Sequence, residues 1–207
     1  MLKRATCLFA GCALFLAACG ESVTAPEPQL DEADVELLTK EVDAELASLL
    51  NGIFEGIGSG AWGVPALAEP RVRNYSWEKS RDCRAGGTVS FAGSGTRTWD
   101  AEARTYDVAS SGSRTRTDCA FVRGDVTITL NGSGSWTHER HYLKRAPTGT
   151  WNTHWAGSFN WAKSTGETGN CSSDLNRTID TAANTVSLTG TYCGREVDRS
   201  RTWKEDR

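Results

Sequence analysis

The chain has 207 residues, of which 24 % are charged, with 23 Lys or Arg against 26 Asp or Glu. This length is enough to bury one sizeable core, and the near balance of charge argues against a nucleic-acid-binding protein, which carries a clear basic excess. The charge is unevenly divided: residues 19–70 hold eleven acids and only Lys40, whereas residues 71–207 hold 15 acids and 20 bases.

The chain begins with a positive start and a short apolar run. Lys3 and Arg4 precede residues 5–18, ATCLFAGCALFLAA, whose fourteen residues are fewer than the ~20 that a spanning helix needs. This pattern is typical of a secretory signal peptide, which we place at residues 1–18. No later segment is long and apolar enough to be a spanning helix.

The apolar run ends in Leu16-Ala17-Ala18-Cys19, which resembles the lipobox of bacterial lipoproteins. The resemblance implies cleavage before Cys19, a diacylglyceryl group on its sulfur and acylation of the new amino terminus. Gly20 follows, and not the Asp that retains such proteins in the inner membrane, so the resemblance favours the outer membrane. Lipid chains contribute ~0.8 kcal/mol per buried methylene and would hold the protein on the membrane. The alternative is an ordinary signal peptide with a chance cysteine.

Residues 19–30 are predicted to be a flexible tether, because prolines and small polar residues oppose a stable helix. Residues 31–57 predict an acidic amphipathic helix that Asp31 can cap. Its apolar residues recur at steps of three and four, namely Val35, Leu38, Val42, Leu46, Leu49 and Ile53. We expect the helix to cover the following domain; the alternative is a coiled-coil or partner-binding helix. Residues 58–71 are predicted to be a loop.

From residue 72 to residue 207 the apolar pattern has a period of two, which indicates half-buried antiparallel strands. The predicted fold is mainly β, an antiparallel meander of six to eight strands that forms a barrel or a sandwich. The expected hairpins join 86–99 to 104–119, 125–142 to 150–163, and 171–180 to 185–203, with an edge strand near 73–81.

Glycines fall repeatedly on the apolar side of these predicted strands, as at Gly93, Gly95, Gly132, Gly134, Gly157 and Gly190. Glycine inside a strand weakens it, so each position needs a structural reason. We expect the glycines to make room for indole rings or to let the sheet curve, because the eight Trp need space in the core. A ligand cleft is the alternative.

Four cysteines stay in the exported part of the chain once Cys7 and Cys12 leave with the signal peptide and Cys19 takes the lipid. An even set in an exported chain indicates disulfides. The midpoints of 83–119 and 171–193 both fall in Asp-led turns, so each pair can bridge one hairpin. We predict Cys83–Cys119 and Cys171–Cys193; the alternative is that the two hairpins are cross-linked to each other.

The sequence carries no motif that names a reaction. On a strand, His138 and His141 point to opposite faces and cannot converge on a metal with His154. No nucleophile elbow occurs, and no pair of acids is marked out by spacing for glycosidase chemistry. We therefore predict no catalytic residues, no metal and no cofactor. A hydrolase with an unrecognised site is kept as a distant alternative.

Arginine and tryptophan share strand faces in three places, and these residues form the candidate binding face: Arg97, Trp99, Trp136, Arg140, Arg201 and Trp203. Such rows can stack as cation–π contacts inside the fold. They can also bind anionic or sugar ligands, such as lipid headgroups, lipopolysaccharide phosphates or acidic glycans. The acidic helix of the same chain is a simpler partner for the basic domain.

These features together predict a lipid-anchored protein of the cell envelope that is attached to the membrane through Cys19. The first hypothesis is a non-catalytic module that binds an envelope glycan, lipid or protein. The second is a purely structural lipoprotein whose helix docks onto an assembly partner. No nucleic-acid partner is expected.

Overall fold

The computed structural model describes residues 29–54 and 71–203. One helix, α1 (Glu32–Phe54), precedes eight strands, which are β1 (Arg71–Asp82), β2 (Thr88–Asp100), β3 (Thr105–Arg123), β4 (Val126–Leu143), β5 (Ala146–Lys163), β6 (Thr168–Asp180), β7 (Thr185–Tyr192) and β8 (Arg195–Thr202). The signal peptide, Cys19, most of the tether, the last expected helical residues 55–57 and nearly all of the loop at 58–71 lie outside the described residues.

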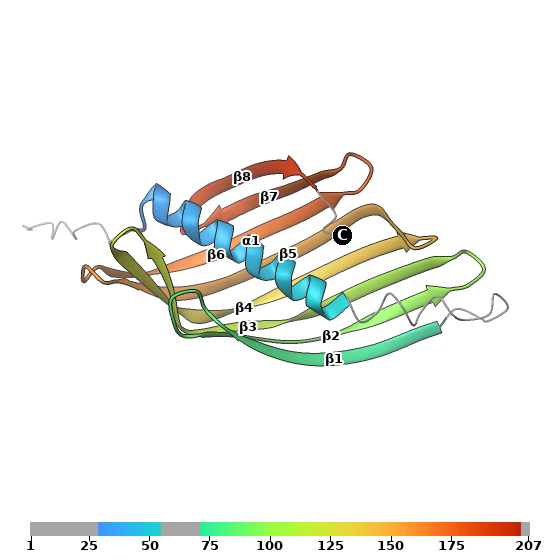
Figure 1. Ribbon diagram of the computed structural model, residues 1–207, viewed down its shortest axis with the longest axis horizontal. Helices are drawn as coiled ribbons and strands as arrows, with labels where there is room; N and C mark the ends of the chain where they lie inside the picture. Colours follow the sequence, from blue (N-terminus) through green and yellow to red (C-terminus); the bar gives the residue numbers. More distant parts are fainter. Residues whose placement is uncertain (1–28, 55–70, 204–207) are drawn as a thin grey trace, which may run out of the picture.

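The strands form a single antiparallel sheet in the order β1-β2-β3-β4-β5-β6-β7-β8. The meander is as predicted, but the barrel or sandwich is wrong, because β1 and β8 stay at opposite edges of one open sheet. Figure 1 shows the reason: the sheet curves, and α1 crosses its concave side. The helix therefore supplies the second layer that a closed barrel or a second sheet would otherwise provide.

Helix α1 forms where the sequence predicts it. The Oδ1 atom of Asp31 accepts a hydrogen bond of 2.8 Å from the backbone N–H of Asp34, which is the geometry of an N-cap. The apolar stripe turns toward the sheet, because Val35 is 5 % exposed and Leu38 and Val42 are each 1 % exposed. This part of α1 therefore covers its own domain, as expected.

The three predicted hairpins and the edge strand are present, with one correction. Residues 185–203 do not form one strand, because the chain reverses between β7 and β8 at Cys193 and Gly194. Both residues have positive φ, 53° and 72°, as a two-residue hairpin turn requires. Nothing in the period-two pattern marks this turn, because a cysteine rarely takes that conformation.

A β-bulge in β3 changes which side chains face the helix. The register shifts between Arg116 and Cys119 opposite β4, and Asp118 within the bulge has a φ of 49°. The extra residue moves the inward positions from even to odd numbers. Consequently both Arg116 and Cys119 are buried, at 4 % and 0 % exposure.

Of the six glycines singled out in the sequence, one, Gly93, accommodates an indole ring as predicted, together with Gly112; a Cβ at the other five would meet the backbone of a neighbouring strand. A Cβ atom at Gly93 or Gly112 would lie 2.7 Å or 2.8 Å from Cζ2 of Trp136. The ring of Trp136 on β4 therefore extends over β3 and β2, and its centroid lies 5.5 Å from that of Trp77 on β1. Because the neighbouring strands carry glycines at these positions, the large side chain of Trp136 can lie across several strands in the core.

Both predicted disulfides are present. Cys83–Cys119 has a Cα–Cα distance of 5.3 Å, and Cys171–Cys193 has one of 4.7 Å. The second bridge closes the base of the β6–β7 hairpin, as expected, since Cys193 N–H donates to the carbonyl of Ser172. The first does not bridge one hairpin: Cys83 lies in the turn between β1 and β2, so its bridge ties that turn to β3.

Among the described residues, no helix is both long and apolar enough to cross a bilayer.

Candidate functional site

The two faces of the sheet carry opposite charge. We call the face under α1 the inner face and the opposite one the outer face. In the observed register every Lys and Arg of the strands points to the inner face: Arg71, Arg73, Lys79, Arg81, Arg97, Arg114, Arg116, Arg123, Arg140, Lys163, Arg177, Arg195, Arg199 and Arg201. Within the described strands, no acid shares that face.

The acids of the strands lie on the outer face, where the other positions are mostly Ser, Thr and Asn. Glu78, Asp82, Asp100, Asp107, Glu139, Asp174, Asp180, Glu196 and Asp198 occupy outward positions of the register. Asp118 in the bulge belongs to this face, because it accepts a hydrogen bond of 2.9 Å from the outward amide of Asn131. An isolated sheet normally mixes both signs on its exposed face, so this separation concentrates positive charge beneath α1.

The six residues of the candidate binding face all lie on the inner face. Trp99, Trp136 and Arg140 are buried, at 9 %, 2 % and 6 % exposure. Arg97 and Trp203 are half-buried, and Arg201 is exposed near the end of edge strand β8. The structure therefore brings these residues to one side of the sheet, but half of them are covered and present no free surface.

Aromatic stacking of arginine occurs between neighbouring strands. The Cζ atom of Arg140 lies 4.7 Å from the ring centroid of Trp151, and that of Arg97 lies 4.2 Å from the ring centroid of Tyr75. Residues two apart on one strand are separated by ~6.8 Å, so an Arg finds a closer ring on the next strand. The predicted cation–π contacts are present, with different partners.

The acidic helix is the partner of this basic face. Asp43 receives a hydrogen bond of 2.8 Å from Nε of Arg177 on β6 and lies 3.2 Å from Nη2 of Arg201 on β8. At the other end, the completely buried Asp34 lies 2.8 Å from both Arg123 Nε and Lys163 Nζ. The ion pairs thus join α1 to strands β3, β5, β6 and β8.

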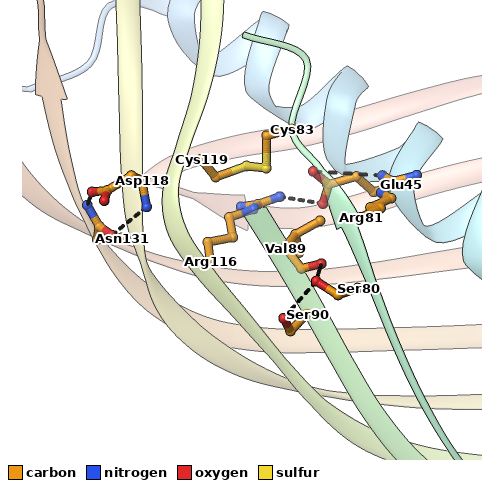
Figure 2. The surroundings of a disulfide bond; sticks show 10 residues. All are labelled: Glu45, Ser80, Arg81, Cys83, Val89, Ser90, Arg116, Asp118, Cys119 and Asn131. Atoms are coloured by element: carbon orange, nitrogen blue, oxygen red, sulfur yellow. Dashed lines mark hydrogen bonds and ion pairs between the residues drawn. A yellow bond between two sulfur atoms is a disulfide. The ribbon is translucent and has the colours of Figure 1, made fainter. Parts of the chain in front are cut away.

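Glu45 makes the most buried of these ion pairs. Its Oε2 atom accepts a hydrogen bond of 2.6 Å from Nη2 of Arg116, and its Oε1 atom lies 3.9 Å from Nη2 of Arg81. Figure 2 shows Glu45 descending from α1 between these two guanidinium groups, next to the Cys83–Cys119 bridge. Burial lowers the pKa of Arg116, but the Glu45 carboxylate and Tyr192 outweigh that effect and raise it.

The middle of the inner face holds a neutral histidine among arginines. His138 is 1 % exposed; its Nδ1 atom lies 2.7 Å from Oγ1 of Thr153, and its Nε2 atom accepts a hydrogen bond of 2.7 Å from Nε of Arg140. Burial, followed by the charges of Arg140 and Arg177, holds the pKa of His138 well below 6.5. This imidazole therefore serves as an acceptor for arginine within the fold.

Acidification should destabilise the protein through His138. The folded imidazole is neutral, whereas the unfolded chain binds a proton at this residue below about pH 6.5. The stability that neutral His138 contributes is therefore complete above that pH and is lost as the pH falls, by up to ~1.4 kcal/mol per pH unit. Urea unfolding of the wild type and of His138→Gln from about pH 7.5 to about pH 5 tests this. The curve of the variant should be flatter, and parallel curves would contradict the prediction.

The other two histidines pair with acids on the outer face. His141 Nδ1 lies 2.7 Å from Asp107 Oδ1, and His154 Nε2 lies 2.9 Å from Asp174 Oδ1. Two hollows described on that face are lined mainly by Ser, Thr, Asn and Ala, and neither includes these pairs. Within residues 29–54 and 71–203, no three His, Cys, Asp or Glu side chains gather to hold a metal ion.

Among the described residues, sequence reasoning missed three of the four buried arginines, Arg114, Arg116 and Arg177. A signal for them exists, because each lies at a position of a predicted strand that the alternating pattern turns toward the inner face. The bulge hides this alternation from Cys119 onward, and only the three-dimensional contacts show that Asp43 pairs with Arg177 and Glu45 with Arg116.

A search of protein-family models, curated proteins and solved structures finds no match to this chain.

Proposed function

We propose that this chain is a lipid-anchored, non-catalytic binding module of the cell envelope, held on the outer membrane through Cys19. Its ligand is an anionic glycan, lipid or protein of the envelope that binds the inner face. The observation that carries this proposal is the separation of charge between the two faces, with every strand Lys and Arg on the inner one. In the ligand-free protein, the acidic helix α1 occupies this face.

The exposed bases at the two sheet edges would meet such a ligand first. Arg71, Arg73 and Lys79 on β1 and Arg195 and Arg201 on β8 are exposed. Basic side chains on edge strands also discourage pairing with other sheets, which explains part of this charge. That role does not explain the buried bases of central strands β3, β4 and β6. Acids of α1 pair with Arg116 and Arg177 in the ligand-free protein, and an anionic ligand would take the place of these acids.

The second hypothesis, a structural lipoprotein whose helix docks onto a partner, is less well supported. Leu38 and Val42 are each 1 % exposed against the sheet, so α1 would have to leave its own domain to present them. The hydrolase hypothesis has as support only the two His–Asp pairs of the outer face, which lie outside the hollows described there.

Binding to polyanions tests the proposal. The full chain, purified in an uncharged detergent, should be retained on immobilised polygalacturonate or dextran sulfate and released by salt, and should pass through neutral dextran. Removing two exposed inner-face charges with Arg73→Gln and Arg195→Gln should weaken retention about fivefold.

The matched control changes the net charge equally on the outer face of the same strands, with Asn74→Asp and Ser200→Asp. This control should bind almost as well as the wild type, because its new charges lie on the opposite side of the sheet. Equal loss in the two double variants, or equal retention on neutral dextran, would refute the proposal.

A further inference from the structure

Arg114 is a buried base of the inner face that has no carboxylate partner among residues 29–54 and 71–203. It lies on β3 and is 8 % exposed. In the described part of the chain it forms no hydrogen bond and no ion pair, unlike its neighbour Arg116. Burial, and then the charge of Arg116, lowers its pKa to about 10, so Arg114 still carries its charge at neutral pH. A buried charge without a partner is strongly unfavourable.

The charges around Arg114 leave one positive charge unmatched. Arg114 and Arg116 supply two guanidinium groups, and the carboxylate that acts on both of them is Glu45. Glu45 is committed to Arg116 by its hydrogen bond of 2.6 Å. Arg81 also approaches Glu45, at 3.9 Å, but its side chain is 34 % exposed and therefore solvated. The buried cluster has a net charge of one, and an added monoanion would neutralise it.

On the side of β2, Arg114 is aligned with the buried Phe91, but on the side of β4 the same row of the sheet begins with small residues. The register aligns Arg114 with Gly134 on β4, Gly157 on β5, Ser173 on β6 and Tyr192 on β7. No side chain rises from the two glycines in this row. The long side chains of β3 and β7 can therefore approach each other above them, and Arg114 and Tyr192 are close enough to influence each other's pKa.

Two buried hydroxyl groups in this row remain able to donate a hydrogen bond. The guanidinium of Arg116 lies close enough to the Tyr192 hydroxyl to donate to its oxygen, but within the described residues neither this hydroxyl nor Oγ of Ser173 has an acceptor for its own proton. Tyr192 is 0 % exposed and Ser173 is 3 % exposed. Burial raises the pKa of Tyr192, so its hydroxyl keeps its proton and can donate. Unsatisfied buried donors beside an unmatched cation are the groups that an oxyanion would satisfy.

We propose that the inner face holds a site for one singly charged oxyanion, a carboxylate or a phosphodiester group, between Arg114 and Tyr192 beneath α1. The guanidinium fork of Arg114 would bind its two charged oxygens, and the hydroxyls of Tyr192 and Ser173 would donate to the remaining lone pairs of these oxygens. This inference rests on the proposed function, in that the oxyanion is a group of the anionic envelope ligand. The Glu45 carboxylate beside the site selects a monoanion over a dianion.

Thermal unfolding of the full chain in uncharged detergent tests this site. At constant ionic strength set with sodium chloride, about 50 mM acetate or dimethyl phosphate should raise the unfolding midpoint by about 3 °C. Sulfate, a dianion, should raise it less. A larger effect of dimethyl phosphate would identify a phosphodiester as the source of the anion, and a larger effect of acetate would identify a carboxylate.

Variants assign the shift to the site. Arg114→Met should abolish it while leaving the fold intact, because the substitution removes an unmatched buried charge. Tyr192→Phe should reduce the shift to about half by removing one donor. The control Arg195→Met removes an exposed base of the same face and should retain the full shift.

The site is refuted if no oxyanion raises the midpoint above the chloride reference, if sulfate acts most strongly, or if Arg114→Met and Arg195→Met respond alike. Retention on polygalacturonate together with one of these results would disprove the site and leave the proposed function standing. A shift that depends on Arg114, without any retention on polyanions, would establish the site and disprove the proposed function.

Discussion

Glu45→Gln is expected to lower the free energy of unfolding by about 3–5 kcal/mol. Glu45 and Arg116 are both buried, with side chains 5 % and 2 % exposed and a hydrogen bond of 2.6 Å between them. The neutral amide cannot compensate the guanidinium, so two buried arginines would then lie side by side without a carboxylate. Chemical denaturation monitored by tryptophan fluorescence measures the effect.

The matched control is Glu41→Gln, on the same helix. Glu41 also pairs with an arginine, at 2.7 Å, but its partner Arg84 is 75 % exposed. Exposed pairs contribute ~0–1 kcal/mol, so this variant should unfold almost as the wild type does. A loss in Glu41→Gln as large as in Glu45→Gln would show that the contact between α1 and the sheet does not depend on the buried pair.

Adding Arg116→Met to Glu45→Gln separates the pair from its unmatched charge. If most of the loss comes from leaving Arg116 buried alone, the double variant should recover a large part of the stability. If the double variant is less stable than either single variant, the pair itself carries the stabilisation. The first outcome is expected, because Arg114 carries a second positive charge in the same cluster. Replacing Arg116 by Met therefore also removes the repulsion between the two guanidinium groups.

The alternation of side chains made much of this fold predictable. A period of two places residues on alternate faces, so the sequence alone orders the inner face of β4 from Val126 to Tyr142 correctly. The position of the amphipathic helix, with its N-cap residue Asp31 and its apolar stripe, follows from the same kind of pattern with a longer period. The disulfide pairs were predictable from their symmetry about two turns, even though Cys83 lies in the turn before β2 and not on β2 itself.

The closure of the sheet was not predictable, because it depends on what fills the concave side. A meander of eight strands can close into a barrel or remain open, and its strand pattern is similar in both cases. The decisive contacts are the ion pairs from α1, such as Asp43 with Arg177, which are 134 residues apart in sequence. Sequence reasoning suggested that the helix would cover the domain but could not assign its acids to particular arginines.

For the candidate site, the sequence predicted which types of residue share a face but not how they are arranged. Arg and Trp were expected to share a face, and they do. The sequence allowed both a buried and an exposed arrangement of these residues, because the strand pattern does not show what covers the inner face. On β3, α1 and the bulge at Asp118 together decide which positions are covered. A bulge adds one residue without an obvious mark in the sequence, and here it moves Cys119 to the side of the sheet on which Arg116 lies.

Trp136→Ala should lower the free energy of unfolding by about 3–5 kcal/mol. Trp136 is 2 % exposed, and its indole covers the glycines of two neighbouring strands and reaches Trp77. No described side chain rises from those glycines to refill the space, so a cavity should remain. The control Trp203→Ala removes a half-buried ring that contacts Trp151 at 5.6 Å and should cost only about 1 kcal/mol. Equal losses in thermal or urea unfolding would contradict this account of the core.

The two glycines under Trp136 should respond differently when an alanine replaces them. A Cβ at Gly93 would lie 2.7 Å from Cζ2 of the indole and 2.9 Å from the backbone oxygen of Ser111, whereas a Cβ at Gly112 would meet the backbone oxygen of Ala92 much more closely, as well as the indole. In the Trp136→Ala background, Gly93→Ala should therefore lose most of its destabilising effect and keep a cost of about 1 kcal/mol from the Ser111 contact, while Gly112→Ala should stay strongly destabilising. If the loss of the indole rescued both alanines equally, the glycine of β3 would be explained by the ring alone and not by the close approach of strands β2 and β3.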